Sequence, residues 1–182
     1  MYQNRLLNTF YCTLILFSFG CFEDKQDLHA DIKPDEKVET TNNKMRIKTT
    51  HGDIIIKFLP EYAPNTIARI KELVSSDFYN GLKFHRVIPG FVAQGGDPKG
   101  NGTGGSGTKL KAEFSDKIKH KKGSVAMARS SDPNSADSQF YISYGAAPHL
   151  DGKYTIFGEV TEGMEYAEQL QVGDKMILVT LE

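Results

Sequence analysis

The segment 84–97, FHRVIPGFVAQGGD, restricts the folds open to this chain more than any other part of the sequence. An apolar, β-prone run at 82–88 is broken by Pro89-Gly90, resumes at 91–93 and stops at two glycines. Proline lacks a backbone donor and glycine lacks a side chain, so both interrupt strands. The segment therefore predicts a strand, a turn and a second strand.

Arg86 is the unusual member of the first strand. Side chains alternate along a strand, so Arg86 is expected to share a face with Phe84 and Ile88. Two interpretations are open for a guanidinium among apolar neighbours. It lies at a sheet edge with its head in water, or it is a fixed cationic donor at the rim of an apolar pocket. Phe91 would floor that pocket, and Gln94 would supply a second donor and acceptor.

This segment resembles the signature of the cyclophilins, the prolyl cis/trans isomerases, nearly residue for residue. The resemblance continues, in the right order, in GSVAMA at 123–128, SQFYI at 138–142 and LDGKYTIFG at 150–158. Four ordered segments are more specific than one short motif, and they cover about residues 45–182. The resemblance implies a mainly β fold, an eight-stranded antiparallel barrel capped by two α-helices, with the active site on the outer surface.

The same resemblance implies the site residues. Arg86 matches the catalytic arginine, and Phe91 and Gln94 complete the catalytic core. The residues implied to bind substrate are Val92, Ala128, Arg129, Gln139, Tyr141, His149, Leu150 and Tyr154. Among them, Val92, Tyr141 and Leu150 match the pocket for the proline ring, together with Phe91.

Five of these positions depart from the best-known eukaryotic pattern of the family. Val92 stands where methionine is common, Tyr141 where phenylalanine is, His149 where tryptophan is, Arg129 where asparagine is, and Tyr154 where histidine is. The catalytic core is unbroken, so isomerase activity is expected.

The other segments predict the rest of the barrel. His51-Gly52 separates strand-like runs at 45–50 and 53–59, and a helix beginning near Pro64 carries Ile67, Ile70, Leu73 and Val74 on one face. Further strands are predicted at 123–128, 140–143, 154–160 and 175–181, and a short helix at 162–170. Strands and helices do not alternate, which favours an antiparallel sheet closed into a barrel.

The N-terminal segment predicts export. Residues 1–20 have a weakly positive start, no acidic residue and an apolar run shorter than the about 20 residues of a membrane span, as in a signal peptide. Cleavage after Gly20 would leave Cys21 first, either lipidated as in bacterial lipoproteins, which we prefer, or unmodified. Polar residues 21–43 predict a flexible tether. The isomerase domain then spans 44–182, in the periplasm or anchored to a membrane outside the cytoplasm.

Other function classes find little support. The net charge is −1, and the lysines of 109–122 lack the aromatic alternation of base-stacking proteins, so this run predicts a solvated loop and no nucleic-acid partner. The glycine-dense run 95–107 satisfies G-x-G-x-x-G, but no helical pattern follows, so it predicts a loop beside the pocket. The histidines are scattered and the domain has no cysteine; neither a metal site nor a cofactor is expected. For His85, a packed strand histidine is preferred to a catalytic role.

An apolar pocket with hydrogen-bond donors and no nucleophile suits a reaction without covalent chemistry, and prolyl isomerisation is such a reaction. The expected partner is a proline-containing polypeptide segment, and the expected oligomeric state is a monomer. The altered positions Arg129 and His149 motivate an alternative, a non-catalytic proline-peptide binding module or chaperone holdase. A nucleic-acid binder that uses the 109–122 lysines is a third hypothesis.

Overall fold

The structure is a computed structural model that describes residues 42–182. Its strands are β1 (Lys44–Lys48), β2 (Asp53–Phe58), β3 (Arg86–Ile88), β4 (Val92–Gly95), β5 (Ser124–Met127), β6 (Phe140–Ser143), β7 (Ile156–Glu162) and β8 (Leu178–Leu181). The helices are α1 (Pro64–Ser75) and α2 (Met164–Ala167), with 3-10 turns η1 (Pro133–Ser135) and η2 (Pro148–Leu150). The predicted signal peptide, Cys21 and nearly all of the predicted tether lie outside the described residues. None of the described helices has the length and apolar character that a membrane crossing requires.

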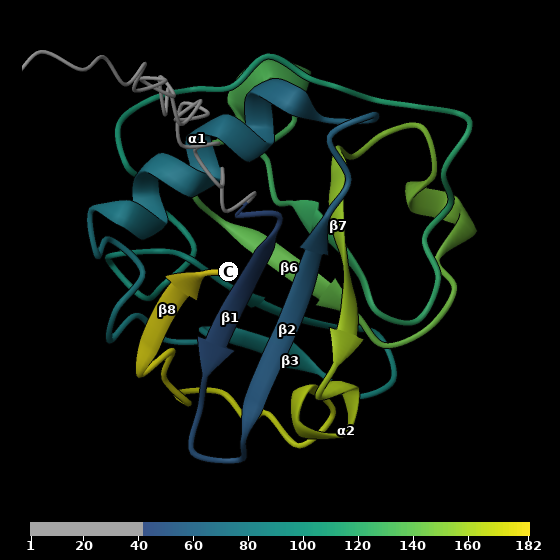
Figure 1. The fold of residues 1–182 in the computed structure, drawn as a ribbon. Coiled ribbons are helices and arrows are strands. Elements are labelled where there is room, and N and C mark those ends of the chain that lie inside the picture. The colour runs from purple at the N-terminus through teal and green to yellow at the C-terminus, as the bar shows by residue number, and fades with distance from the viewer. Residues whose placement is uncertain (1–41) are drawn as a thin grey trace, which may run out of the picture. The chain divides into compact units, whose positions relative to one another are not determined.

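The strands form one eight-stranded sheet in the order β3-β4-β6-β5-β7-β2-β1-β8, and every pairing in it is antiparallel. The sheet curls on itself, and α1 and α2 lie at opposite ends of it (Figure 1). The mainly β, antiparallel prediction with two helices is therefore confirmed.

The two outer strands, β3 and β8, are connected through the segments that precede them. The Met176 N–H donates to the Leu82 carbonyl over 2.9 Å, and the Met176 carbonyl accepts from the Gly81 N–H over 2.7 Å. The Phe84 N–H donates to the Asp174 carbonyl over 2.8 Å. These bonds bring the two ends of the sheet together.

Helix α1 confirms the predicted amphipathic pattern. Ile67, Ile70, Leu73 and Val74 are all buried on one of its faces. Apolar side chains three and four residues apart lie on the same side of a helix, so this spacing alone predicts the buried face.

The central strands have apolar side chains on both faces. Ile142 and Val125 are paired across β6 and β5 and point into the main core. The neighbouring residues Tyr141 and Ala126 are also paired, but they point to the opposite face. There they form a second, smaller apolar cluster with Val92 of β4. This outer cluster supplies the floor of a pocket.

Several predicted boundaries are shifted or too long. The strand predicted at 154–160 is observed at Ile156–Glu162, the strand predicted at 175–181 at Leu178–Leu181, and the helix predicted at 162–170 at Met164–Ala167. The strand predicted from 82 begins only at Arg86.

The predicted face shared by Phe84 and Arg86 is wrong. Phe84 is fully buried in the main core, whereas Arg86 is exposed, as Ile88 is. The reason is that Phe84 lies in the segment that pairs with residues 173–176, while Arg86 is the first residue paired with β4. Alternation does not continue from one pairing into the other.

Candidate active site

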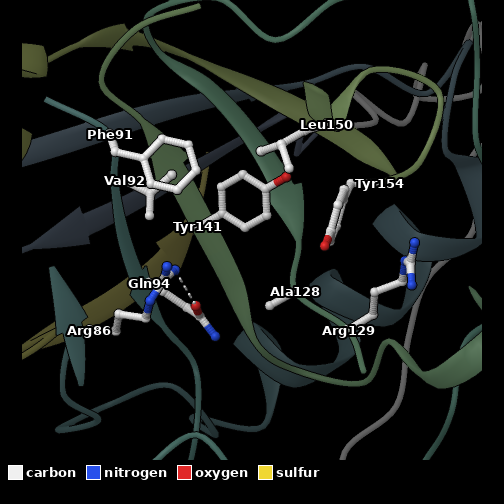
Figure 2. Close-up of a pocket in the computed structure, with 9 residues that line it drawn as sticks. All are labelled: Arg86, Phe91, Val92, Gln94, Ala128, Arg129, Tyr141, Leu150 and Tyr154. Atoms are coloured by element: carbon white, nitrogen blue, oxygen red, sulfur yellow. Dashed lines mark hydrogen bonds between the residues drawn. The ribbon is translucent and has the colours of Figure 1, made fainter. Parts of the chain in front are cut away.

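A pocket of about 250 Å³ opens on the outer face of the sheet, over the second apolar cluster (Figure 2). It is lined by Arg86, Phe91, Val92, Gln94, Ala128, Arg129, Tyr141, Leu150 and Tyr154. These nine belong to the eleven predicted site residues, three catalytic and eight substrate-binding, and the structure brings them together from five separate parts of the chain.

The register of three strands explains the grouping. Arg86 of β3 lies opposite Gln94 of β4, and Gln94 lies opposite Tyr141 of β6. Directly opposed residues point to the same face, so the three side chains form a row across the outer surface. Val92 precedes Gln94 by two residues and shares its face. The apolar wall is completed by Leu150, which ends η2.

A chain of hydrogen bonds holds the polar side of the pocket. Arg86 Nη1 donates to Gln94 Oε1 over 3.2 Å, and Gln94 Nε2 donates to Gln139 Oε1 over 2.9 Å. Gln139 Nε2 in turn donates to the carbonyls of Gly102 and Gly104 over 3.1 and 2.8 Å. The glycine-dense loop thus fixes the orientation of the amide that Arg86 contacts.

Arg86 combines both interpretations of its sequence. It lies on β3, the first strand of the sheet order, with its side chain exposed, and it also lines the rim of the pocket. Within residues 42–182 it forms no ion pair with a carboxylate. The positive charge is therefore available to a ligand.

A second pocket of about 360 Å³ adjoins the first and shares Gln94, Ala128 and Arg129 with it. Gln139, a predicted site residue absent from the first pocket, lines this one. The loop 102–104 also lines it, so the predicted loop beside the pocket is observed.

His149 lines neither pocket. Its ring stacks on Phe91 with 5.7 Å between the ring centroids and 26° between the planes. Since Phe91 lines the first pocket, His149 contacts the wall of that pocket without lining it.

The Tyr141 side chain is held by a chain of hydrogen bonds that runs through His120 to Asp151. The Tyr141 hydroxyl lies 2.9 Å from His120 Nε2, and His120 Nδ1 lies 2.9 Å from Asp151 Oδ1. The carboxylate accepts the Nδ1 hydrogen, which leaves Nε2 as the acceptor for the hydroxyl. Burial raises the pKa of Tyr141 well above its ordinary value, so the phenol keeps its proton and donates. The backbone N–H and the ring of His120 lower the pKa of Asp151, which keeps it ionised.

Sequence reasoning missed His120, which lies within the lysine-rich run 109–122 and was assigned to a solvated loop with it. The His120 side chain is 0% exposed. Two lysines of the run do face solvent and pair with carboxylates, Lys121 with Glu159 at 2.9 Å and Lys122 with Glu168 at 2.6 Å. Sequence reasoning could have distinguished His120 from the neighbouring lysines only by expecting buried and exposed positions to alternate along this run.

Other chemistry finds no residues at this site. Within residues 42–182 no three His, Cys, Asp or Glu side chains are close enough to hold a metal ion together. Both ring nitrogens of His85 are buried without a hydrogen-bond partner in this part of the chain. Burial lowers the pKa of His85, outweighing the nearby Asp97, so its ring stays neutral at pH 7. The site has a cation, amides and an apolar floor. Its one hydroxyl beside a base, that of Tyr141, keeps its proton because burial raises its pKa, so it is a poor nucleophile.

Comparison with known proteins agrees with this geometry. Residues 44–177 match the family described as cyclophilin type peptidyl-prolyl cis-trans isomerase/CLD. A probable peptidyl-prolyl cis-trans isomerase of Brucella abortus is 43% identical over 163 residues, covering 77% of this chain and 83% of the relative. Peptidyl-prolyl cis-trans isomerase B of Bacillus subtilis is 45% identical over 130 residues, covering 71% and 90%.

Solved structures show the same architecture. A Cryptosporidium parvum cyclophilin-type isomerase, crystallised in the presence of the dipeptide Ala-Pro, superposes with a TM-score of 0.71 at 30% identity. The match covers 76% of this chain and 98% of that one.

Proposed function

Because this chain belongs to the cyclophilin-type peptidyl-prolyl cis-trans isomerase family, and so isomerises X-Pro bonds, we propose that Arg86 catalyses the rotation by donating a hydrogen bond to the prolyl nitrogen. Phe91 and Gln94 would complete the catalytic core. The observation that carries this role is a guanidinium, at the rim of an apolar pocket, that has no carboxylate partner among residues 42–182.

The rotation is slow because the X-Pro bond has partial double-bond character, with a barrier of about 18–20 kcal/mol. That character uses the lone pair of the prolyl nitrogen. When the bond twists, the lone pair returns to the nitrogen, which becomes a better acceptor. A hydrogen bond from Arg86 is then stronger in the transition state than in either ground state, and such differential binding accelerates a reaction.

The proline ring would occupy the apolar part of the first pocket, between Phe91, Val92, Tyr141 and Leu150. These side chains surround a hydrocarbon ring without offering it a hydrogen-bond partner, apart from the buried Tyr141 hydroxyl, which is already bonded to His120. A ring held here places its nitrogen toward the polar side, where Arg86 and Gln94 lie (Figure 2).

The substrate would be a proline-containing polypeptide segment that crosses both pockets. The Ala-Pro dipeptide used with the Cryptosporidium parvum relative supports this class of ligand. Ala128 and Gln139 would hold the chain next to the proline, because they line the second pocket and Gln139 is fixed by the glycine-dense loop.

The most direct test replaces Arg86 with alanine. We expect kcat/KM on an Ala-Ala-Pro-Phe peptide to fall roughly ten- to a hundredfold, the range of a charge-assisted hydrogen bond of about 1.5–3 kcal/mol. The melting temperature should stay within a few degrees, because the Arg86 side chain is exposed. Lys99→Ala is the matched control, since Lys99 is exposed and lines neither pocket.

An Arg86→Ala protein with the full rate would show that the mechanism is wrong. A wild-type protein that binds the peptide but leaves its cis/trans exchange unchanged would instead favour the binding module or holdase.

We also propose that the enzyme acts on exported proteins. The support is the sequence of residues 1–43, with a predicted signal peptide, a cysteine at the expected first mature position and a predicted polar tether. Mass spectrometry of the mature N-terminus tests this: a lipid-modified Cys21 is expected, and an unmodified Cys21 would remove the membrane anchor but keep export. A mature chain that still begins at Met1 would contradict both.

A further inference from the structure

The Arg129 guanidinium lies at the rim shared by the two pockets, yet it is bound by the protein itself. Its Nε donates to the Lys153 carbonyl over 3.0 Å, and its Nη1 donates to the carbonyls of Ser130 and Ser131 over 2.8 and 3.2 Å. All three acceptors are neutral main-chain oxygens. Such bonds fix the plane of the guanidinium instead of neutralising its charge.

This plane rests against an aromatic ring of the pocket. The Arg129 Cζ atom is 4.7 Å from the centre of the Tyr154 ring and 5.6 Å from that of Phe114. Both distances lie within the range of cation–π attraction. In Figure 2, Tyr154 stands between Arg129 and Tyr141, and its ring meets that of Tyr141 edge-on with 6.0 Å between centroids and 79° between planes.

Besides its packing on the second apolar cluster, the Tyr154 side chain is restrained by the stacked Arg129 guanidinium. Unlike the hydroxyl of Tyr141, the hydroxyl of Tyr154 makes no hydrogen bond within residues 42–182. Tyr154 also lies in a bend before β7, outside the ladder of the sheet. Its ring is therefore held by Tyr141 on one side and by the guanidinium on the other.

We propose that Arg129 is a positioning residue, which holds the Tyr154 ring against the proline pocket and acts on the substrate only through that ring. This rests on the proposed function in one respect, namely that the first pocket receives the proline. It differs from the direct substrate contact that the family resemblance implies for position 129.

Two consequences follow from this role. Lysine cannot replace Arg129, because a single ammonium on a flexible stem cannot reach the three carbonyls and the face of the ring at the same time. The loss should appear in binding rather than in the chemical step. The pocket wall contacts the proline ring equally before and during rotation, and loss of such uniform binding raises KM while kcat is kept.

A double-mutant cycle on the full chain tests this. The variants are Arg129→Lys, Tyr154→Leu and the two together; for each we would measure KM, kcat and, by calorimetry, the Kd for an Ala-Ala-Pro-Phe peptide. We expect Arg129→Lys to raise KM and Kd about three- to tenfold in the wild-type background, the range of a partly desolvated cation–π contact. In the Tyr154→Leu background the same change should alter them less than about 1.5-fold, because the ring through which Arg129 acts is gone.

Lys111→Gln is the matched control, because it removes a positive charge from an exposed site on a neighbouring loop that lines neither pocket. Its KM and Kd should equal those of the wild type. Thermal melting of each variant identifies the folded population, and Arg129→Gln replaces Arg129→Lys if the latter does not fold.

An effect of Arg129→Lys that persists undiminished with Tyr154→Leu would overturn the proposal, because Arg129 would then contact the substrate directly. Unchanged KM and Kd in the single variant would overturn it as well. The Kd readout is independent of turnover, so a wild-type protein that binds the peptide without isomerising it would contradict the proposed function and still decide the role of Arg129.

Discussion

The Tyr141 hydroxyl connects the floor of the pocket, through His120, to the loop that carries Leu150. Tyr141 belongs to β6, whereas Asp151 directly follows Leu150, and His120 bonds to both. The His120 and Tyr141 rings also stack, with 11° between their planes. All polar atoms of this trio that are out of reach of water have a partner, which is the condition for a buried polar group to cost little.

Tyr141→Phe should therefore reduce stability, even though phenylalanine is common at this position in the family. The variant leaves His120 Nε2 as a buried acceptor without a donor, which costs about 1–3 kcal/mol. Urea unfolding should show a loss of that size. The control is Tyr154→Phe, which removes a hydroxyl without a partner in the described residues and should cost less than about 0.5 kcal/mol. Equal losses in the two variants would contradict the role of His120.

On the scale of the element, helix α1 depends on a residue far away in the sequence. Its N-cap is Ala63, which provides no side-chain hydrogen bond. Glu113 takes that place: its carboxylate accepts from the Asn65 N–H and the Thr66 N–H over 3.0 and 2.8 Å, and from the Thr66 hydroxyl over 2.7 Å. A carboxylate here satisfies unpaired donors and also faces the positive end of the helix dipole.

Glu113→Gln should cost about 0.5–2 kcal/mol at pH 7, the usual range for loss of a cap. The amide keeps one oxygen but turns its NH2 group toward donors. Burial alone would raise the pKa of Glu113, but the hydrogen bonds from Thr66 and Asn65 outweigh it and lower the pKa. A lowered folded-state pKa stabilises the protein above the unfolded value of about 4.3, and this stability is lost as the pH falls through the folded pKa.

Unfolding by urea at pH 7 and at pH 3 measures this. The difference between wild type and Glu113→Gln should shrink toward zero at the lower pH. Glu72→Gln is the control on the same helix: among residues 42–182 the exposed Glu72 carboxylate pairs only with Arg69, so its loss should cost less than about 0.5 kcal/mol. A difference for Glu113→Gln that is the same at both pH values would show that the charge has no part in it.

Local sequence patterns predicted the helices and strands whose positions depend mainly on their own residues. The face of α1 follows from the spacing of Ile67 and Ile70, and β6 was predicted within its observed bounds, Phe140–Ser143. The cap from Glu113 could not be predicted, because nothing near residue 113 indicates that its carboxylate meets a helix 47 residues away. The grouping of the pocket residues came from resemblance to a family. Their spacing alone gives no reason for Leu150 to meet Phe91.

At the scale of the whole molecule, the sheet closes through a segment that local patterns misassign. Residues 81–84 look like the start of a strand, but they bond to residues 173–176. Asp174 fixes this closure: its carbonyl accepts from the Phe84 N–H, and its carboxylate lies 2.7 Å from His51 Nε2, at the turn between β1 and β2. Asp174 therefore links the β1–β2 hairpin to the seam, which is the pair of hydrogen-bonded segments 81–84 and 173–176 where the sheet closes.

Asp174→Asn should loosen this seam without unfolding the protein. The neutral amide accepts more weakly than the carboxylate from His51 Nε2 and from the Gln171 N–H, which the carboxylate holds at 2.7 and 2.8 Å. We expect local opening to cost about 1 kcal/mol less, so the Phe84 and Met176 amides should exchange their hydrogens roughly fivefold faster. Amides of β5 and β6, in the centre of the sheet, should keep their rates.

Hydrogen exchange followed by NMR separates these regions residue by residue. Asp77→Asn serves as the control, because among residues 42–182 the exposed Asp77 carboxylate accepts a side-chain hydrogen bond only from Asn80 and lies outside the segments 81–84 and 173–176. The pH dependence of the closure follows from the ionisation of the Asp174 carboxylate. Burial raises the pKa of Asp174, but the hydrogen bonds from Gln171 and His51 outweigh it, so the net pKa is lowered. The closure is then strongest above the unfolded pKa of about 3.9 and weakens as the pH falls through the folded value.

Uniformly faster hydrogen exchange over the whole sheet would instead mean that Asp174 stabilises the fold globally and that the seam does not open by itself.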